Sequence, residues 1–227
     1  SPGMRGAGRL SATAALRGGA GYVRCPSPDG TPQCPTEAVA VELSPDTWVD
    51  DVVGGAERFA CLAIGPGLGC STDVVAGVRE VLRRAPVPVV VDGDALVALG
   101  HDAASILGHR EAPTVLTPHD GEFEALVGRP PGDDRIDAAR SLAAGTRATV
   151  LLKGPTTVVA DPDGSVLLVR AGDARLATAG TGDVLTGLVA AHLALGAEPG
   201  RGAAAAAQLH GLAASLGAPR SLVASDL

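Results

Sequence analysis

The sequence has very few aromatic side chains and no excess of basic ones. Only four of its 227 residues are Trp, Tyr or Phe, and the formal net charge at pH 7 is −7. Nucleic acids and anionic membranes bind basic surfaces, and unpaired bases also require aromatic side chains on which to stack. The composition therefore argues against a nucleic-acid partner and against a membrane-surface partner.

A long uninterrupted apolar run is also missing. The longest one lies near residues 203 to 216 and contains Gln208 and His210, whereas a bilayer span needs about 20 apolar residues. We therefore expect no transmembrane segment.

Closely spaced cysteine pairs are absent as well. The four cysteines form no Cys-x-x-Cys pair, and a chain of this length does not need disulfides for stability. We expect reduced thiols and a cytoplasmic location.

The ends of the chain have no obvious boundary signals. It starts at Ser1-Pro2-Gly3 without Met and stops at Asp226-Leu227, shortly after Leu222-Val223-Ala224, which has the pattern of a strand start. We therefore expect both ends to be trimmed. The length and a hydrophobic content of 46% predict a single domain over residues 1–227.

Short Val-rich runs alternate with helical patterns along the chain. Residues 74 to 82 have the apolar spacing of an amphipathic crossover helix. This alternation predicts an α/β fold with a mainly parallel sheet and helices on both faces. The predicted strands are 59–64, 87–91, 114–116 and 149–152.

The last third of the chain has a different pattern. Residues 156–160 and 165–169 flank Asp161-Pro162-Asp163-Gly164, a turn sequence suited to a hairpin, which predicts an antiparallel edge to the sheet. Residues 183–195 and 202–216 predict two buried helices. Residues 129–134 are the expected flexible loop.

Chemically useful residues follow each predicted strand. Ligands of open α/β sheets bind at the carboxyl ends of the strands, so these residues are the candidate site. They are Gly65-Pro66-Gly67-Leu68-Gly69, Asp92-Gly93-Asp94, Thr117 to Glu122, and Lys153-Gly154.

The Gly-rich segment at 65–69 has two interpretations. Its glycines let backbone N–H groups approach a phosphate or a ribose, but they also suit a tight turn between strand and helix. It is not a dinucleotide fingerprint, because Cys70 stands where the third Gly belongs, and no Walker A sequence is present.

Residues 178–183, Thr-Ala-Gly-Thr-Gly-Asp, open a long apolar helix. The N–H groups of Gly180, Thr181 and Gly182 at a helix start favour an anion and predict a phosphate site. Asp183 is then either a favourable partner of the helix dipole or a base that accepts a proton from an attacking hydroxyl.

Four further residues each have two interpretations. Lys153 at a strand end predicts either a phosphate contact or a surface lysine, and His119 is either a ligand donor or a plain loop histidine. Asp92 and Asp94 either hold Mg²⁺ through water or cap the helix that starts near Ala95. The histidines show no metal-ligand spacing, and the metal ligands remain open.

Seven segments, in order, resemble the ADP-dependent NAD(P)H-hydrate dehydratases of the ribokinase-like superfamily. The resemblance implies a three-layer sandwich and an enzyme that restores hydrated NADH and NADPH. The segments are Gly6-Ala7-Gly8 with 15–21, AIGPGLG at 63–69, VVVDGDAL at 89–96, LTPHDGEFEAL at 116–126, VLLKGPTTVV at 150–159, LATAGTGDVLTG at 176–187 and LHG at 209–211.

The resemblance also implies roles for individual residues. Ala7, Gly67, His119 and Asp183 would contact the hydrated cofactor (NADHX or NADPHX), with Asp183 catalytic. ADP would be the co-substrate, with Mg²⁺ as cofactor. The residues that would contact ADP or AMP are Lys153, Gly154, Pro155, Thr156, Thr157 and Gly182.

The resemblance further implies a homo-oligomer, with a tetramer favoured, and an epimerase as partner or fused domain. Two features depart from the family pattern. Members usually have an additional strand before Gly6, and they usually have Pro where this chain has Asp120. Two other functions remain open: a kinase of a vitamin precursor or alcohol on the same fold, and a nucleotide-binding module without catalysis.

Overall fold

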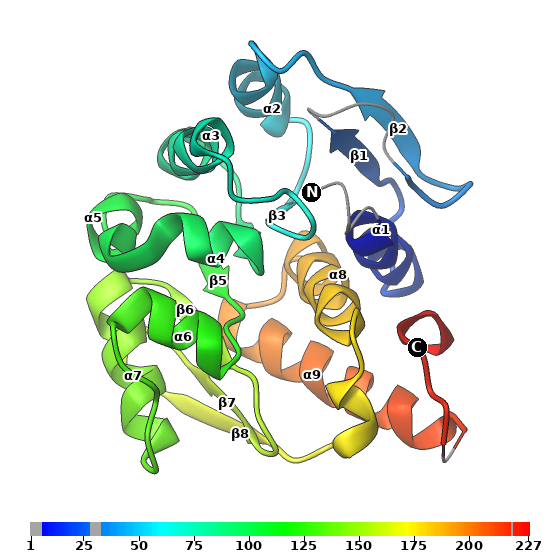
Figure 1. Cartoon of the computed structure of the whole chain (residues 1–227), viewed down its shortest axis with the longest axis vertical. Coiled ribbons are helices and arrows are strands. Elements are labelled where there is room, and N and C mark those ends of the chain that lie inside the picture. Colours follow the sequence, from blue (N-terminus) through cyan, green and yellow to red (C-terminus); the bar gives the residue numbers. More distant parts are fainter. Residues whose placement is uncertain (1–5, 28–32, 219) are drawn as a thin grey trace.

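A computed structural model describes residues 6–27, 33–218 and 220–227. Its centre is a six-stranded sheet in the order β3-β4-β5-β6-β7-β8, in which β3 to β6 are parallel and β6 to β8 antiparallel (Figure 1). The strands are β3 (Leu62–Ile64), β4 (Val89–Val91), β5 (Thr114–Leu116), β6 (Thr149–Leu152), β7 (Thr157–Ala160) and β8 (Val166–Val169).

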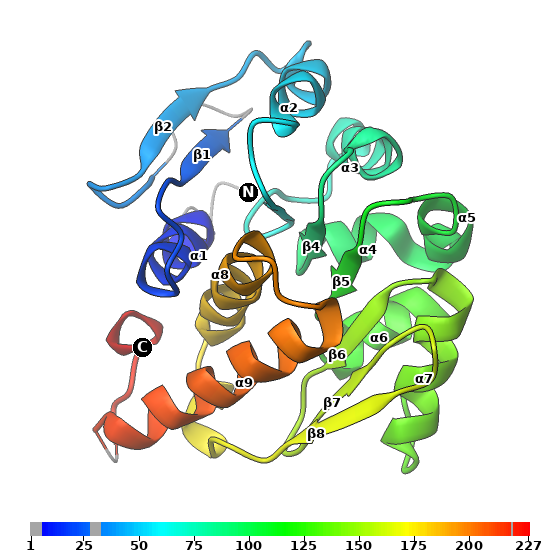
Figure 2. The same ribbon diagram turned by 180° about the vertical axis from the view of Figure 1, so that it is seen from behind.

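Helices cover both faces of this sheet, as Figures 1 and 2 show from opposite sides. The α-helices are α1 (Gly6–Arg17), α2 (Trp48–Ala56), α3 (Thr72–Arg84), α4 (Asp94–Leu99), α5 (Ala103–Leu107), α6 (Asp120–Val127), α7 (Arg135–Thr146), α8 (Thr181–Ala194) and α9 (Pro199–Leu216). Short 3₁₀ turns lie at Gly100–Asp102, Ala174–Ala177 and Ala224–Asp226.

The strand order explains which helices lie on which face. The parallel strands add one after another in the same direction, and right-handed crossovers in that direction put every connecting helix on the same face. The helices α3 to α7 accordingly share one buried cluster with the sheet. The opposite face is covered by α8 and α9, whose side chains form a second cluster with Val90, Val115 and Leu151.

Most predicted elements are confirmed. The strands at 114–116 and 149–152 have the predicted bounds, and the hairpin closes with an Asp161 N–H bond to the Ser165 carbonyl at 3.0 Å. The first two strands are shorter than predicted, because residues 59–61 and 87–88 do not pair in the sheet. Residues 129–134 form the connection between α6 and α7.

The strand predicted at Leu222-Val223-Ala224 is wrong. Ala224 begins a 3₁₀ turn, and its side chain packs with Ala14 of α1 and Val184 of α8. This segment therefore lies on helices rather than at a sheet edge, and an apolar triplet alone does not distinguish these two environments. The predicted trimming at Ser1-Pro2-Gly3 lies outside the described residues.

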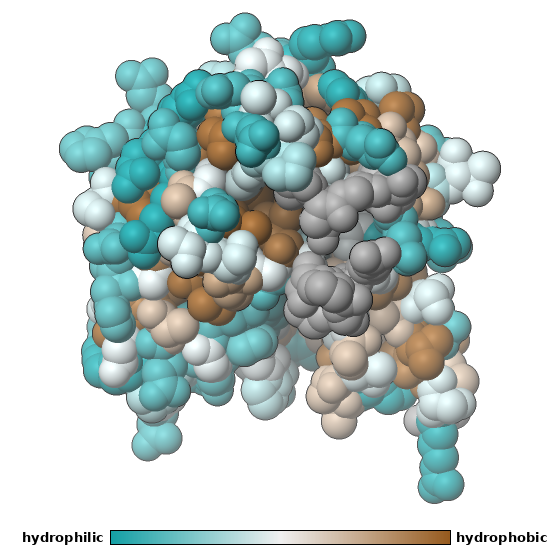
Figure 3. Space-filling view, turned by 45° about the horizontal axis from the view of Figure 1, so that its top comes forward, coloured by the Kyte–Doolittle hydropathy of each residue, from teal (hydrophilic) through white to brown (hydrophobic). Residues whose placement is uncertain are grey.

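A second, smaller sheet was not predicted. It pairs β1 (Arg24–Ser27) with β2 (Val39–Glu42) in parallel. A cavity of about 830 Å³ separates this sheet from β3 and is also lined by α1, α2 and α8. Viewed from the end of the molecule that carries α2 and β2, apolar side chains gather near the centre of the surface, with polar ones around them (Figure 3).

The four cysteines are all free, as expected. Of the helices that the structure describes, none has both the length and the apolar character that a bilayer crossing requires.

The contact between α1 and α8 depends on Gly187. A methyl group at this position would lie 2.1 Å from the Ser11 carbonyl oxygen and 2.9 Å from the Ala14 side chain. We expect Gly187→Ala to lower the free energy of unfolding by about 1–3 kcal/mol, because the two helices must separate. Urea unfolding measures the change.

Gly145 provides the matched control. It is an exposed glycine of α7 with open space around it, and Gly145→Ala should leave stability unchanged or raise it by up to about 1 kcal/mol. Equal effects of the two substitutions would contradict the proposed close contact.

Candidate active site

The carboxyl ends of β3, β4 and β5 and the first turn of α8 surround one pocket. Its volume is about 290 Å³. It contains three of the four residues predicted to contact the hydrated cofactor, and they come from three distant parts of the sequence. The lining residues are Pro66, Gly67, Gly93, Asp94, Val97, His119, Gly121, Glu122 and Asp183.

The Gly-rich loop after β3 forms one wall of this pocket. Gly65, Gly67 and Gly69 all have positive φ, and a side chain on Gly65 would lie 1.7 Å from the Asp92 carbonyl oxygen. The glycines therefore make a tight turn, as the simpler interpretation predicts. The same turn brings Pro66 and Gly67 to the pocket, so a tight turn is compatible with a ligand contact there, which stays a prediction.

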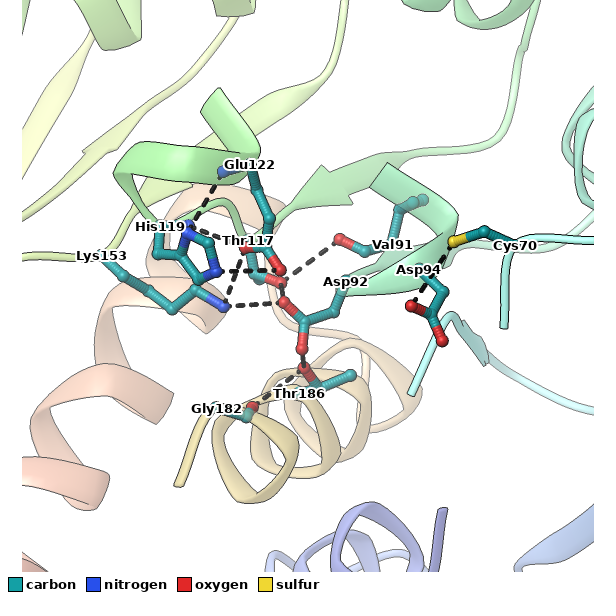
Figure 4. Close-up of polar contacts among 10 residues, drawn as sticks. All are labelled: Cys70, Val91, Asp92, Asp94, Thr117, His119, Glu122, Lys153, Gly182 and Thr186. Carbon is teal, nitrogen blue, oxygen red and sulfur yellow. Dashed lines mark hydrogen bonds and ion pairs between the residues drawn. The ribbon is translucent and has the colours of Figure 1, made fainter. Parts of the chain in front are cut away.

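Asp92 is the centre of a buried hydrogen-bond network (Figure 4). The residue is 3% exposed. Its Oδ1 accepts from Thr117 Oγ1 at 2.8 Å and from Lys153 Nζ at 2.8 Å, while its Oδ2 accepts from Thr186 Oγ1 at 2.7 Å. The carboxylate thus joins the ends of β4, β5 and β6 to α8.

Lys153 is not an exposed surface lysine, and it has charged partners within the protein. Its ammonium forms an ion pair with Asp92 at 2.8 Å and lies 3.5 Å from Glu122 Oε2. Burial alone would lower the pKa of Lys153, but the two carboxylates outweigh it and raise the pKa. The Nζ atom also lies 3.5 Å from the position of a Cβ on Gly182, so this cation sits below the first turn of α8.

Asp92 and Asp94 do not cap α4 through their side chains. The helix begins at Asp94 after Gly93, with no side-chain cap bond, and Asp94 instead accepts from the Gly69 N–H at 2.6 Å. Both oxygens of Asp92 already accept from protein donors. The described residues contain no group of three His, Cys, Asp or Glu side chains able to hold a metal ion, so a bound Mg²⁺ would take further oxygen ligands from water or from nucleotide phosphates.

His119 caps α6 and also faces the pocket. Its Nδ1 accepts from the Glu122 N–H at 3.1 Å, and Glu122 Oε2 accepts from the His119 N–H at 2.8 Å. Because Nδ1 is an acceptor, the proton of the neutral ring lies on Nε2. The side chain is 61% exposed, and Nε2 lies 3.5 Å from Glu122 Oε1, so the ring atom that carries the proton already has a carboxylate neighbour.

The unusual Asp120 is compensated within the protein. Its carboxylate pairs with Arg135 Nη1 at 2.8 Å. The Nη2 atom of the same arginine donates to the Lys153 carbonyl at 2.7 Å. Asp120 therefore brings no unpaired charge to the pocket, which it does not line, and Arg135 connects the loops of His119 and Lys153.

The first turn of α8 presents backbone N–H groups toward this region. Gly180 precedes the helix with φ +91°, and no described backbone carbonyl accepts a hydrogen bond from the N–H of Gly180, Gly182 or Asp183. Thr181 departs from the prediction, because its N–H already donates to the Thr178 carbonyl at 3.3 Å. Within the described residues, the N–H groups of Gly182 and Asp183 are therefore more available to an anion than that of Thr181.

Asp183 is a carboxylate with altered acidity. Its pKa is raised from 3.8 to about 6, mainly by burial and then by the charge of Asp92, while Lys153 acts in the opposite direction. Asp94 and Glu122 raise it further. A carboxylate with such a pKa accepts a proton more readily at neutral pH than an ordinary aspartate does.

The remaining predicted residues lie outside this pocket. Ala7 is a buried residue of α1, residues 154–156 form the turn from β6 into β7, and Thr157 is the first residue of β7. Thr117 was predicted only as a residue that follows a strand, without a role of its own. The roles of Thr186, which lies one turn after Asp183, and of Arg135, which carries no local signal, were not predicted.

The chain matches the NAD(P)H-hydrate dehydratase family over residues 1–226. It is 42% identical to the bifunctional NAD(P)H-hydrate repair enzyme Nnr of Moorella thermoacetica over 246 aligned positions, which cover 100% of this chain and 46% of that protein. It is 47% identical to Nnr of Mycobacterium tuberculosis over 160 positions, covering 70% of this chain and 33% of that protein. The chain thus spans about half the length, or less, of these curated relatives.

The fold matches solved structures as well. The ADP/ATP-dependent NAD(P)H-hydrate dehydratase from Bacillus subtilis, co-crystallised with ATP/Mg²⁺, superimposes with a TM-score of 0.82 at 32% identity, covering 99% of this chain and 82% of that one. Hydroxyethylthiazole kinase from Pyrococcus horikoshii, at 19% identity and a TM-score of 0.65, shares the fold alone. The α/β three-layer fold is therefore ribokinase-like, and the chain belongs to the NAD(P)H-hydrate dehydratase family.

Proposed function

We propose that this chain dehydrates (6S)-NADHX and (6S)-NADPHX to NADH and NADPH at the expense of ADP, forming AMP and phosphate. The observation that carries the proposal is the position of Asp183. It lines the same pocket as Gly67 and His119, while its neighbour Gly182 lies beside Lys153. A base and a phosphate-binding turn are thus adjacent, as transfer of a phosphoryl group to a hydroxyl requires.

In this mechanism Asp183 receives the proton of the hydrate's hydroxyl. The hydroxyl oxygen then bonds to the β-phosphorus of ADP, and the bond from that phosphorus to the oxygen of AMP breaks. The N–H groups of Gly182 and Asp183 bind the transferring group, and the ammonium of Lys153 offsets its charge. The ring nitrogen's electron pair then expels phosphate, and loss of a ring proton restores the double bond.

The remaining predicted contacts fall into two groups. We propose that one group binds the hydrated cofactor and the other binds the adenine nucleotide, at separate ends of the site. His119 lines the pocket with a side chain that is 61% exposed, and its Nε2 is the donor we propose for the hydrated cofactor, with Ala7 as a further contact. Lys153, Gly182, the turn at residues 154–156 and Thr157 at the start of β7 are the contacts we propose for the adenine nucleotide.

We also propose that Mg²⁺ accompanies the nucleotide. The Bacillus subtilis relative was co-crystallised with ATP/Mg²⁺. Because the described residues offer no cluster of metal ligands, the cation would be held chiefly by the phosphates. ADP as the co-substrate in place of ATP rests on the family resemblance.

The oligomeric state, the partner domain and the cellular location are also proposals. Exposed leucines along α9, Leu209, Leu212 and Leu216, support a homo-oligomer, for which the resemblance favours a tetramer. The curated relatives are named bifunctional and are about twice as long, which supports an epimerase domain as partner. The reduced cysteines are compatible with the cytoplasm.

A coupled assay tests the proposed reaction. The protein is incubated with NADPHX, ADP and Mg²⁺, and the return of NADPH absorbance is followed together with AMP and phosphate. We expect equal amounts of all three products, and no signal without nucleotide. A flat trace would overturn the proposal. Phosphorylation of a free alcohol in the same preparation would then identify a kinase, and bound nucleotide without any turnover would identify a binding module.

A further inference from the structure

Thr186 connects the catalytic turn of α8 to the sheet. It is fully buried, at 0% exposure, and lies one helical turn after Asp183. Its hydroxyl lies 2.7 Å from Asp92 Oδ2 and 3.1 Å from the Gly182 carbonyl. A single side chain therefore touches both the sheet carboxylate and the turn that bears the proposed base.

Asp92 is itself fixed and is a suitable anchor. Its other oxygen accepts from Thr117, which follows β5, and from Lys153, which follows β6. Charge-assisted hydrogen bonds in a buried environment are stronger than neutral ones. Thr186 is the hydrogen-bonding link in this network that comes from α8, as Figure 4 shows.

The position of the first turn of α8 determines where two groups lie: the backbone N–H groups of the turn and the Asp183 carboxylate. The Lys153 ammonium lies close to the α-carbon of Gly182, so a small rotation of α8 would change the distance between this cation and the N–H groups of the turn. The same rotation would move the Asp183 carboxylate within the pocket. Shifts of about 1 Å are enough to lower rates by about a hundredfold.

We propose that Thr186 is a positioning residue, which holds the first turn of α8 against Asp92 so that Asp183, Gly182 and Lys153 act on the same phosphoryl group. This role rests on the proposed function. Thr186 itself does not line the pocket, and its effect is transmitted through the helix.

Thr186→Val tests this role, because it keeps the shape of the side chain and removes the hydroxyl. We expect kcat to fall by about tenfold or more with KM for ADP and NADPHX changed by less than about threefold, since the loss is in transition-state alignment. Thr186→Ser restores the hydroxyl and should recover kcat to within about threefold of the parent.

Thr146→Val is the matched control. Thr146 is 2% exposed, and its hydroxyl bonds to the Leu142 carbonyl of its own helix at 2.7 Å, in α7. It loses a comparable buried hydrogen bond away from the site, so its kcat should stay within about twofold of the parent. Equal losses of kcat in the two valine variants, or full activity of Thr186→Val, would overturn the proposal.

A second measurement does not require turnover. Amide hydrogen exchange over residues 180–187 should become about tenfold faster in Thr186→Val, with exchange in α7 unchanged. Unchanged exchange in this turn would also overturn the positioning role. A parent protein that does not convert NADPHX would overturn the proposed function instead, and the exchange comparison alone would then decide the role of Thr186. If Thr186→Val does not fold, Thr186→Cys replaces it in both measurements.

Discussion

Replacing Asp183 with Asn is expected to lower kcat by about 10²- to 10⁴-fold, because the variant keeps the shape of the side chain but cannot accept a proton at neutral pH. Nucleotide affinity should stay within about tenfold of the parent, since the N–H groups of the turn remain. Single-turnover kinetics with NADPHX and a nucleotide titration measure the two quantities. A parallel loss of nucleotide binding and turnover would contradict the assignment of Asp183 as the base.

The pKa of Asp183 adds a pH dependence to this result. Because the pKa is about 6, the base form is lost as the pH falls, and kcat/KM of the parent should decline below about pH 6. The effect on stability has the opposite direction. The fold disfavours the charged carboxylate, so Asp183 destabilises the protein above about pH 6, and this cost disappears as the pH falls toward 3.8.

The variant therefore provides its own folding control. Asp183→Asn should unfold at the same urea concentration as the parent, or a higher one, at pH 7 to 8, and the difference should vanish near pH 4. A variant that is less stable at neutral pH would mean that its loss of activity reflects a damaged fold.

Lys153→Met is expected to have the largest effect on stability. Lys153 compensates the charge of Asp92, which is 3% exposed, and removal of one partner of a buried ion pair costs about 3–5 kcal/mol. Urea unfolding measures the loss. The additional substitution Asp92→Asn removes the uncompensated charge. Its amide oxygen can accept from one of the two threonine hydroxyls and its NH2 group can donate to the other, so it should restore at least half of the lost stability.

The exposed pair of Arg84 and Asp50 is the control for this prediction. Its charged atoms are also 2.8 Å apart, but the two side chains are 42% and 73% exposed. Arg84→Met should therefore change the free energy of unfolding by only about 0–1 kcal/mol. An equally small effect of Lys153→Met would show that the buried pair is not required for stability.

The local sequence determined the main elements of this fold. Short apolar runs identified β3 to β6, and Asp161 to Gly164 identified the hairpin between β7 and β8. The strand predicted at Leu222 was wrong because its apolar side chains pack on α1 and α8. The β1 and β2 pair escaped notice because these two short, partly exposed strands lack a continuous apolar pattern.

The position of the site could also be predicted, because parallel strands place their carboxyl ends at one edge of the sheet. Gly67, His119 and Asp183 do line one pocket. Their ionic partners could not be predicted. Asp92 and Lys153 are 61 residues apart in the sequence and form an ion pair. Asp120, in α6, forms an ion pair with Arg135, in α7.

At residues 178–183, too, the sequence determined the local structure and the tertiary structure determined the contacts. The sequence by itself determined that a helix starts there with glycines and a carboxylate, since helix starts depend on nearby residues. Only the tertiary structure decided that Asp183 lies in a pocket with a raised pKa, that Lys153 lies below Gly182, and that the N–H of Thr181 is already used. The physical reason is that burial and charge pairing depend on distances between remote segments, which are fixed only when the sheet and its helices pack together.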